Sequence, residues 1–388
     1  MLRLSFVLAL CVIILSACGG SSGSTEPTAT AVVTELPTVA TTATPGATPE
    51  VRVPNVAPAT DITLPAGFAA YPIATGFVRA TSVAPAFDGT IFVSERGGTV
   101  YRLVDANGDG VFEQSGEFTS GFSEITGIMI APDGTLYVSS RGSVTTVRDA
   151  NGDGAGAGDQ SQAVISGLPV GRHQNNGLAI GPDGKLYVTN GSTCDDCTEE
   201  DPRSASILQA NLDGSDLRVY AHGLRNPYDI VFDAQGRLWA TDNGSDAPCA
   251  TNDELNLIVD GGDYGWPYAA DGCDPQADGT PPVADLGLHT AATGIAAYDA
   301  EQFPAEYRGG LFATVWGSFF AKPDPYDRVL LSINVQNDAG TVDTFASGFK
   351  HPIDVFADSD GSLLVLDYGS DDVDAHDGTL YRVVYTGQ

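Results

Sequence analysis

The sequence predicts an all-β fold, a six-bladed β-propeller built from four-stranded blades. Three observations predict it: a repeated hairpin pattern, a regular repeat period, and abundant glycine (46 residues) without helical patterning after the N-terminus. Each repeat holds an apolar strand, a turn of Asp-Gly type and a second apolar strand, because glycine supplies the positive φ that such turns require. The six copies begin at Ser82, Gly127, Gly177, Asp229, Gly294 and Asp354.

The repeat spacing sets the number of strands in each blade. The turn glycines lie 45 to 73 residues apart, at Gly89, Gly134, Gly184, Gly236, Gly309 and Gly361. This spacing leaves room for two further strands after each hairpin, which is the period of a propeller blade. A β-sandwich with similar hairpins is the alternative. We expect the last strand, TLYRVVY, to share a blade with the segment near Asp61.

The N-terminus predicts export. An arginine, a short apolar run and small residues make residues 1–17 a secretory signal, and the apolar run is too short for a membrane span. Leu15-Ser16-Ala17-Cys18 resembles a bacterial lipobox, which implies a lipidated Cys18; an ordinary cleaved signal is the alternative. Residues 18–60 are rich in Thr, Ala and Pro and predict a flexible tether, followed by the propeller at 61–388. The protein is then anchored to the outer face of a bacterial membrane or faces the periplasm.

The charge excludes some partners. A net charge of −32 repels nucleic acid and anionic lipid, so we expect membrane contact through the lipid anchor only. With 18 Lys and Arg residues, a site for a polyanionic ligand depends on a few cations or a metal. The sequence has no Walker loop, no GxGxxG on a strand-to-helix turn and no GxSxG elbow, so ATP, nicotinamide and serine-hydrolase chemistry lack support.

Four cysteines remain after export, and their even number in an oxidising compartment favours two disulfides of open connectivity. A redox-active CxxC pair is disfavoured, because the two intervening acidic residues raise the thiol pKa. A zinc site lacks further ligands at matching spacing. The four are Cys194, Cys197, Cys249 and Cys273.

The middle third carries a specific resemblance. The strings GLPVGRHQNNGLAIGPDGKLYVTNGSTCDDC, GLRNPYDIVF and DELNLIVDGGDYGWPY, in this order, resemble the glucose/sorbosone dehydrogenase family. The CDDC loop followed by DPRSASIL is most similar to its sorbosone-type branch. The resemblance implies a propeller that binds pyrroloquinoline quinone (PQQ), often with calcium. It further implies oxidation of a sugar or polyol outside the cytoplasm, with the electrons passed to a separate acceptor.

The resemblance also implies site residues. His173 matches the base that takes a hydroxyl proton while the hydride passes to the quinone, a role that suits a neutral imidazole. Arg225 and Asn226, in GLRNP, match the pair at the cofactor; a loop-stabilising Arg225 is the alternative. The family's late basic positions read differently here, and the side chains expected to contact the cofactor there are Trp316, Lys350 and His351.

Calcium is expected at up to three loops. Asn243-Gly244-Ser245 aligns with the family's calcium loop, which implies backbone ligands at Gly244 and Ser245. Two other loops have oxygen-bearing side chains at alternate positions but lack the glutamate of an EF-hand, so they are either weak calcium sites or plain outer turns. Their candidate ligands are Asp105, Asn107 and Asp109, and Asp149, Asn151 and Asp153.

Two other functions stay open. One is a non-catalytic propeller that binds a carbohydrate or a protein. The other is a calcium-dependent, lactonase-like hydrolase, which needs carboxylates and amides converging on the axis. The candidates for that ring are Asn176, Asn226, Asp242 and Asn243.

Overall fold

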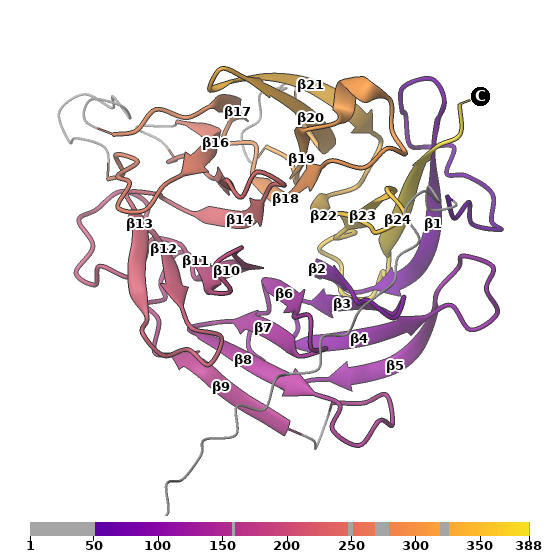
Figure 1. Cartoon of the computed structure of the whole chain (residues 1–388), viewed down its shortest axis with the longest axis horizontal. Coiled ribbons are helices and arrows are strands. Elements are labelled where there is room, and N and C mark those ends of the chain that lie inside the picture. The colour runs from indigo at the N-terminus through magenta and orange to yellow at the C-terminus, as the bar shows by residue number, and fades with distance from the viewer. Residues whose placement is uncertain (1–50, 157–159, 247–250, 268–278, 319–325, 388) are drawn as a thin grey trace, which may run out of the picture. The chain divides into compact units, whose positions relative to one another are not determined.

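The computed structural model describes residues 51–156, 160–246, 251–267, 279–318 and 326–387. The chain divides into two units, 1–46 and 47–388, and every described residue belongs to the second. In that unit the described strands form six antiparallel sheets of four strands each. The predicted six-bladed propeller is confirmed (Figure 1).

Five blades are built from consecutive strands. The first two blades contain β2 (Ala80–Pro85), β3 (Ile91–Glu95), β4 (Thr99–Val104), β5 (Glu113–Thr119), β6 (Gly127–Ile130), β7 (Leu136–Ser140), β8 (Ser143–Arg148) and β9 (Gln160–Ser166). The next two contain β10 (Asn175–Ile180), β11 (Leu186–Asn190), β12 (Ser206–Ala210), β13 (Arg218–His222), β14 (Pro227–Phe232), β15 (Leu238–Asp242), β16 (Asn252–Ile258) and β17 (Ala284–Leu288). The fifth contains β18 (Ala292–Tyr298), β19 (Gly310–Val315), β20 (Val329–Gln336) and β21 (Ala339–Ser347).

The predicted hairpins are the inner halves of the blades. In each blade the first strand of the repeat is the innermost, and it contacts the innermost strands of its neighbours, as β10 does with β6 and β14. The second strands of these hairpins lie between neighbouring blades. Five of them are buried at every position, namely β3, β7, β11, β15 and β23. This burial is what holds the six sheets around one axis.

The sixth blade closes the ring with strands from both ends of the chain. Its order is β1 (Phe68–Phe77), β24 (Gly378–Tyr385), β23 (Leu363–Asp367) and β22 (Pro352–Ala357). The first and last strands pair from Phe68 opposite Tyr385 to Phe77 opposite Gly378. The predicted pairing of the last strand with the N-terminal segment is confirmed, with a partner that starts seven residues after Asp61.

The propeller unit begins before the predicted boundary at residue 61. The amide of Asn55 donates to the carbonyl of Asp109 at 2.7 Å, and that of Ala59 donates to the carbonyl of Ala70 at 2.8 Å. Residues 51–60 therefore lie on the propeller, because these bonds and the buried Pro54 tie them down. The predicted signal (1–17) and Cys18 lie outside the described residues. Among the residues that are described, no helix is long and apolar enough to cross a membrane.

Candidate functional site

A cavity of about 650 Å³ lies where the inner strands begin. Each inner strand, or the residue just before it, contributes to the lining, so the ring of blades itself forms the cavity floor. These residues are Thr81, Thr126, Asn176, Tyr228, Thr293 and Ile353. Its volume is in the range of small-molecule and cofactor sites.

A second set of lining residues occupies one position of the repeat. Five repeats place a residue between the end of the second strand and the following glycine, and each of these residues lines the cavity. They are Arg96, Arg141, Asn243, Trp316 and Tyr368. This position was visible in the sequence as the residue before the glycine that ends each repeat. Their common location in one cavity follows only from the arrangement of the six blades around the axis.

The third repeat lacks that residue and provides the space for His173. It reads LYVTNG, so Gly191 directly follows β11. A Cβ added at Gly191 would lie 2.6 Å from the Cβ of His173 and 2.5 Å from Oδ1 of Asn226. Because no side chain occupies this point, His173 and Asn226 both reach the cavity, which they line.

The hydrogen bonds of His173 fix its tautomer. Nδ1 lies 2.9 Å from Oγ of Ser192, and that hydroxyl donates its one proton to the carbonyl of Cys194 at 2.6 Å. The hydroxyl oxygen can then only accept from His173, so Nδ1 carries the proton and Nε2 has the lone pair. Burial, with the nearby Arg225 and Arg172, lowers the pKa of His173 to about 3. His173 is therefore a neutral imidazole with an unprotonated Nε2 over the ordinary pH range.

Arg225 lines the cavity but uses its donors inside the protein. The side chain is 1% exposed, and Nη2 donates to Oδ1 of Asp195 at 2.5 Å, while Nη1 donates to the carbonyl of Asn243 at 3.2 Å. The carboxylate of Asp242 accepts the backbone N–H groups of Arg225 and Asn226 at 3.0 and 2.7 Å. These contacts agree with the alternative in which Arg225 stabilises the loop.

Amides form a chain along the cavity wall. Nδ2 of Asn176 donates to Oδ1 of Asn226 at 3.0 Å, and Nδ2 of Asn226 donates to Oδ1 of Asn243 at 3.0 Å. The side-chain oxygens of Asn226 and Asn243 are thus used by neighbouring amides rather than directed at a common point. Among the His, Cys, Asp and Glu side chains of the described residues, the group of three close enough to share a metal is Cys194, Cys197 and Glu199, and its two cysteines are joined in a disulfide. The carboxylate and amide ring that a lactonase-like hydrolase needs is not supported by this arrangement.

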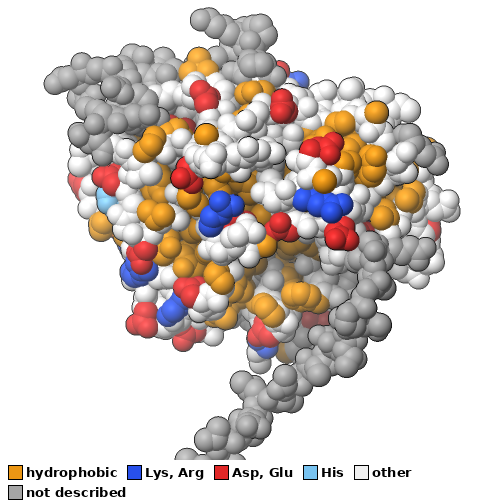
Figure 2. Space-filling model, turned by 45° about the horizontal axis from the view of Figure 1, so that its top comes forward, with side chains coloured by type: hydrophobic (Ala, Val, Ile, Leu, Met, Phe, Trp, Pro, Cys, Tyr) orange, Lys and Arg blue, Asp and Glu red, His pale blue; other side chains and the backbone are white. Residues whose placement is uncertain are grey.

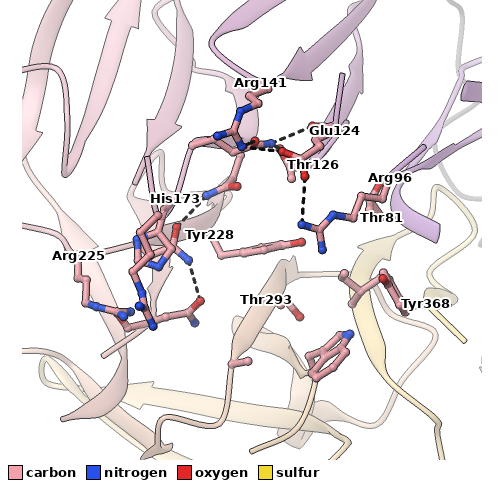
Figure 3. Close-up of a pocket in the computed structure, with 18 of the residues that line it drawn as sticks. Thr81, Arg96, Glu124, Thr126, Arg141, His173, Arg225, Tyr228, Thr293 and Tyr368 are labelled. Carbon is pink, nitrogen blue, oxygen red and sulfur yellow. Dashed lines mark hydrogen bonds and ion pairs between the residues drawn. The ribbon is translucent and has the colours of Figure 1, made fainter. Parts of the chain in front are cut away.

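Arg96 and Arg141 face His173 across the cavity and were missed from the sequence. Both bind the carboxylate of Glu124, Arg96 at 3.3 Å and Arg141 at 2.6 Å, and Figure 3 shows this cluster opposite His173 and Arg225. Their side chains are 53% and 40% exposed. With Arg172 and Arg225, four of the 18 cationic residues line one cavity. On the face seen in Figure 2, Lys and Arg side chains are sparse, and most of them have acidic side chains nearby.

The three late positions separate in the structure. Trp316 lines the cavity and stacks on His351, with ring centroids 3.9 Å apart. Nδ1 of His351 lies 2.9 Å from the carbonyl of Trp316. Nζ of Lys350 pairs with Asp377 at 2.9 Å. Neither Lys350 nor His351 is among the lining residues of this cavity, and His351 instead supports Trp316.

The expected calcium loops bind donors of their own. The carbonyls of Asn243 and Ser245, on either side of Gly244, accept from Arg225 and from the amide of Thr251, and a guanidinium beside these oxygens does not suit a divalent cation. Asp105 accepts N–H groups of Gly108 and Gly110 at 2.7 and 2.9 Å, within the β4–β5 turn that also contains Asn107 and Asp109. The β8–β9 turn repeats these contacts at Asp149, Asn151 and Asp153.

One disulfide is present in the described residues. It joins Cys194 to Cys197 and closes the loop that follows β11. Cys249 and Cys273 lie outside the described residues. The loop lies against the cavity wall, since its Asp195 binds Arg225.

Known proteins resemble this chain over different lengths. Quinoprotein glucose dehydrogenase B of Acinetobacter calcoaceticus is 37% identical over 75 residues, 16% of this chain and 15% of that protein. An uncharacterized protein of Borreliella burgdorferi is 29% identical over 209 residues, 47% of this chain and 53% of that protein. The chain therefore matches about half, or less, of the length of these relatives.

Solved structures match over nearly their whole length. The PQQ-bound form of aldose sugar dehydrogenase from Streptomyces coelicolor is 25% identical, with a TM-score of 0.64, and the match covers 83% of this chain and 99% of that one. The fold is thus that of soluble PQQ-dependent sugar dehydrogenases. A family model described as a domain of unknown function, DUF7133, matches residues 71–316, and since this is more than half of the chain, the chain belongs to that family.

Proposed function

We propose that this protein is a PQQ-dependent dehydrogenase that oxidises a sugar or polyol outside the cytoplasm. The observation that carries the proposal is His173, whose Nε2 is kept unprotonated in a cavity lined by arginines. The likeness to the PQQ-bound aldose sugar dehydrogenase supports it. The sorbosone-type branch is a finer proposal, carried by the CDDC loop and DPRSASIL.

The cavity residues fit PQQ. The cofactor has three carboxylates, and guanidinium groups bind carboxylates through paired N–H donors. Arg96 and Arg141 hold Glu124 through Nη atoms and keep further donors of the five on each guanidinium. Arg96 and Arg141 would therefore hold the carboxylates, while Trp316 offers a flat apolar surface to a planar ring. Arg172 lines the same cavity and pairs with Asp246 and Asp195. The basic residues absent from the late repeats are thus replaced by arginines of the first two blades.

The chain's own groups account for the proton. When bound, the quinone accepts the two electrons and the hydrogen of a substrate C–H bond as a hydride. Nε2 of His173 takes the proton of the adjacent hydroxyl, and the carbon–oxygen bond becomes a carbonyl. Ser192 orients the imidazole through Nδ1, so that Nε2 is the atom free to accept.

Location and partners belong to the same proposal. A lipidated Cys18 would hold the propeller at the outer face of a bacterial membrane or facing the periplasm, with a separate acceptor for the electrons. Calcium is assigned no step, because in the loop that the resemblance suggested the carbonyl of Ser245 accepts from Thr251 and the carbonyl of Asn243, next to Gly244, accepts from Arg225. The turns around Asp105 and Asp149 stay candidate weak calcium sites.

The test is titration of residues 47–388 with PQQ, followed by dye reduction with a panel of aldoses and polyols. We expect saturable binding, and sugar-dependent reduction that falls at least about 100-fold in His173→Ala. His222→Ala is the matched control, because His222 lies on the outer strand β13 and pairs with Asp263. Absence of binding at micromolar PQQ would refute the proposal and favour a propeller that binds carbohydrate or protein without catalysis.

A further inference from the structure

The loop closed by the Cys194–Cys197 disulfide contacts both halves of the candidate site. The carbonyl of Cys194 accepts the hydroxyl of Ser192 at 2.6 Å, and Ser192 in turn holds Nδ1 of His173 at 2.9 Å. The next residue, Asp195, accepts Nη2 and Nε of Arg225 at 2.5 and 3.1 Å. Two consecutive residues of one short loop, Cys194 and Asp195, are thus linked by hydrogen bonds to the His173 side and to the buried Arg225.

Asp195 is the nearer of two carboxylates at Arg225. Its Oδ1 also pairs with Nε of Arg172 at 3.8 Å and accepts the backbone N–H of Asp246 at 3.3 Å. Its carbonyl accepts Nε1 of the buried Trp266 at 3.2 Å. Oδ1 of Asp246 lies 3.4 Å from Nη2 of Arg225, against 2.5 Å for Oδ1 of Asp195. Since Arg225 is 1% exposed, removal of Asp195 leaves the buried guanidinium with only the longer ion pair, which is costly.

The disulfide restrains this loop together with the contacts of Asp195 and the bonds that the Glu199 carboxylate accepts from the N–H and Oγ1 of Thr193 at 2.5 and 2.7 Å. Asp196, Cys197 and Thr198 are exposed, so little packing holds that side of the loop. A covalent link between Cys194 and Cys197 restricts the backbone of both residues between them. The Cys194 carbonyl and the Asp195 carboxylate are therefore fixed together.

We propose that the Cys194–Cys197 loop is the positioning element of the site: the Cys194 carbonyl sets the tautomer of His173 through Ser192, and Asp195 holds Arg225. Ser192 and Asp195 are positioning residues in this scheme, and the disulfide couples them. The inference rests on the proposed function, because it takes His173 as the base. Its contacts, however, can be tested without cofactor or substrate.

The first readout is the ¹⁵N chemical shifts of the His173 ring, which distinguish its tautomers. The wild type is expected to show a protonated Nδ1 and an unprotonated Nε2. In Ser192→Ala, and in the double variant Cys194→Ser/Cys197→Ser, the resonances shift as the Nε2–H tautomer becomes populated. Ser206→Ala is the matched control, because this buried serine of the same blade bonds the carbonyl of Arg203 and should leave the His173 shifts unchanged.

The second readout is modification of Arg225 by phenylglyoxal, followed by peptide mass analysis. The buried guanidinium should react slowly in the wild type and at least about tenfold faster in Asp195→Asn and in the double serine variant, because the charge pair is worth more than one factor of ten. Asp196→Asn, next to it in the loop but exposed, should leave the rate unchanged.

Combining the changes tests the coupling. Asp195→Asn should raise the rate of Arg225 modification less in the double serine variant than in the wild type. The reason is that both changes weaken the same contact, between Asp195 and Arg225. If PQQ turnover is present, Ser192→Ala should lower kcat about tenfold with little change in KM. Unchanged ¹⁵N shifts and an unchanged Arg225 rate in the double serine variant would overturn the inference, whether or not PQQ binds. If that variant fails to fold, the same null results in Ser192→Ala and Asp195→Asn overturn it.

Discussion

Gly191 lies directly against His173: a Cβ added to the glycine would be 2.6 Å from the Cβ of the histidine. Real Cβ atoms do not approach so closely, so the histidine reaches the cavity because this position has no side chain. The contact arises because the third repeat is one residue shorter than the others, so that Gly191 directly follows β11. The length of this strand end therefore affects the position of His173.

Gly191→Ala should therefore displace His173 or Asn226 and lower dehydrogenase activity by at least about tenfold. The matched control is Gly97→Ala in the first blade, where an added Cβ meets nothing within 4 Å. Activity is measured by dye reduction, and folding by the far-UV spectrum and the unfolding midpoint. Equal activity in the two variants would show that the close packing at Gly191 is not required.

Arg141→Gln should weaken PQQ binding by about tenfold, because it removes a partly exposed guanidinium from the cavity. Arg148→Gln provides the control, since Arg148 lies on β8 and pairs with Asp133 at the surface. Isothermal titration at several salt concentrations gives both dissociation constants. An unaltered constant for Arg141→Gln would place the cofactor's carboxylates elsewhere.

The pKa of His173 should stay far below its usual value without ligand and rise when a polycarboxylate binds. Burial is the largest cause of the lowered value, about 3, and the Arg225 and Arg172 charges add to it. An anionic ligand against the arginines offsets their charge and so favours the imidazolium. NMR titration of the His173 ring should show no protonation between pH 8 and about pH 4 in the free protein. A midpoint near 6.5 would contradict the burial that the structure gives it.

Stability should decrease as the pH rises through neutrality, in part because of Glu254. Burial raises the pKa of this carboxyl to about 7, while in the unfolded chain it titrates near the ordinary glutamate value of 4.5. The folded state thus holds the proton over a range where the unfolded state has lost it. Its contribution is present below about pH 4.5 and is lost as the pH rises through 7.

Glu254→Gln should flatten this dependence by up to one proton, or about 1.4 kcal/mol per pH unit. Urea unfolding at pH 5, 6, 7 and 8 measures the slope. Glu306→Gln, an exposed glutamate after the fifth inner strand, should leave it unchanged. A slope that does not differ between the two variants would mean that Glu254 is ionised in the folded protein at these pH values.

The six hairpins and the blade period could be predicted from the sequence, because alternating apolar residues and turn glycines are local patterns. Closure by the last strand was expected from the way propellers generally close, and it joins Phe68 to Tyr385. The resemblance in the middle third identified His173, which the structure places in the cavity with an unprotonated Nε2.

The set of cations that meet at the site could not be read from the sequence, because it depends on the tertiary structure. Arg96 and Arg141 lie far from His173 along the chain, and they join it because the strand ends of every blade converge on one axis. Lys350, which was expected at the cofactor, pairs instead with Asp377, and Arg225 pairs with Asp195. Side-chain direction depends on which carboxylate lies nearest in space, and that neighbour belongs to a segment distant in the sequence.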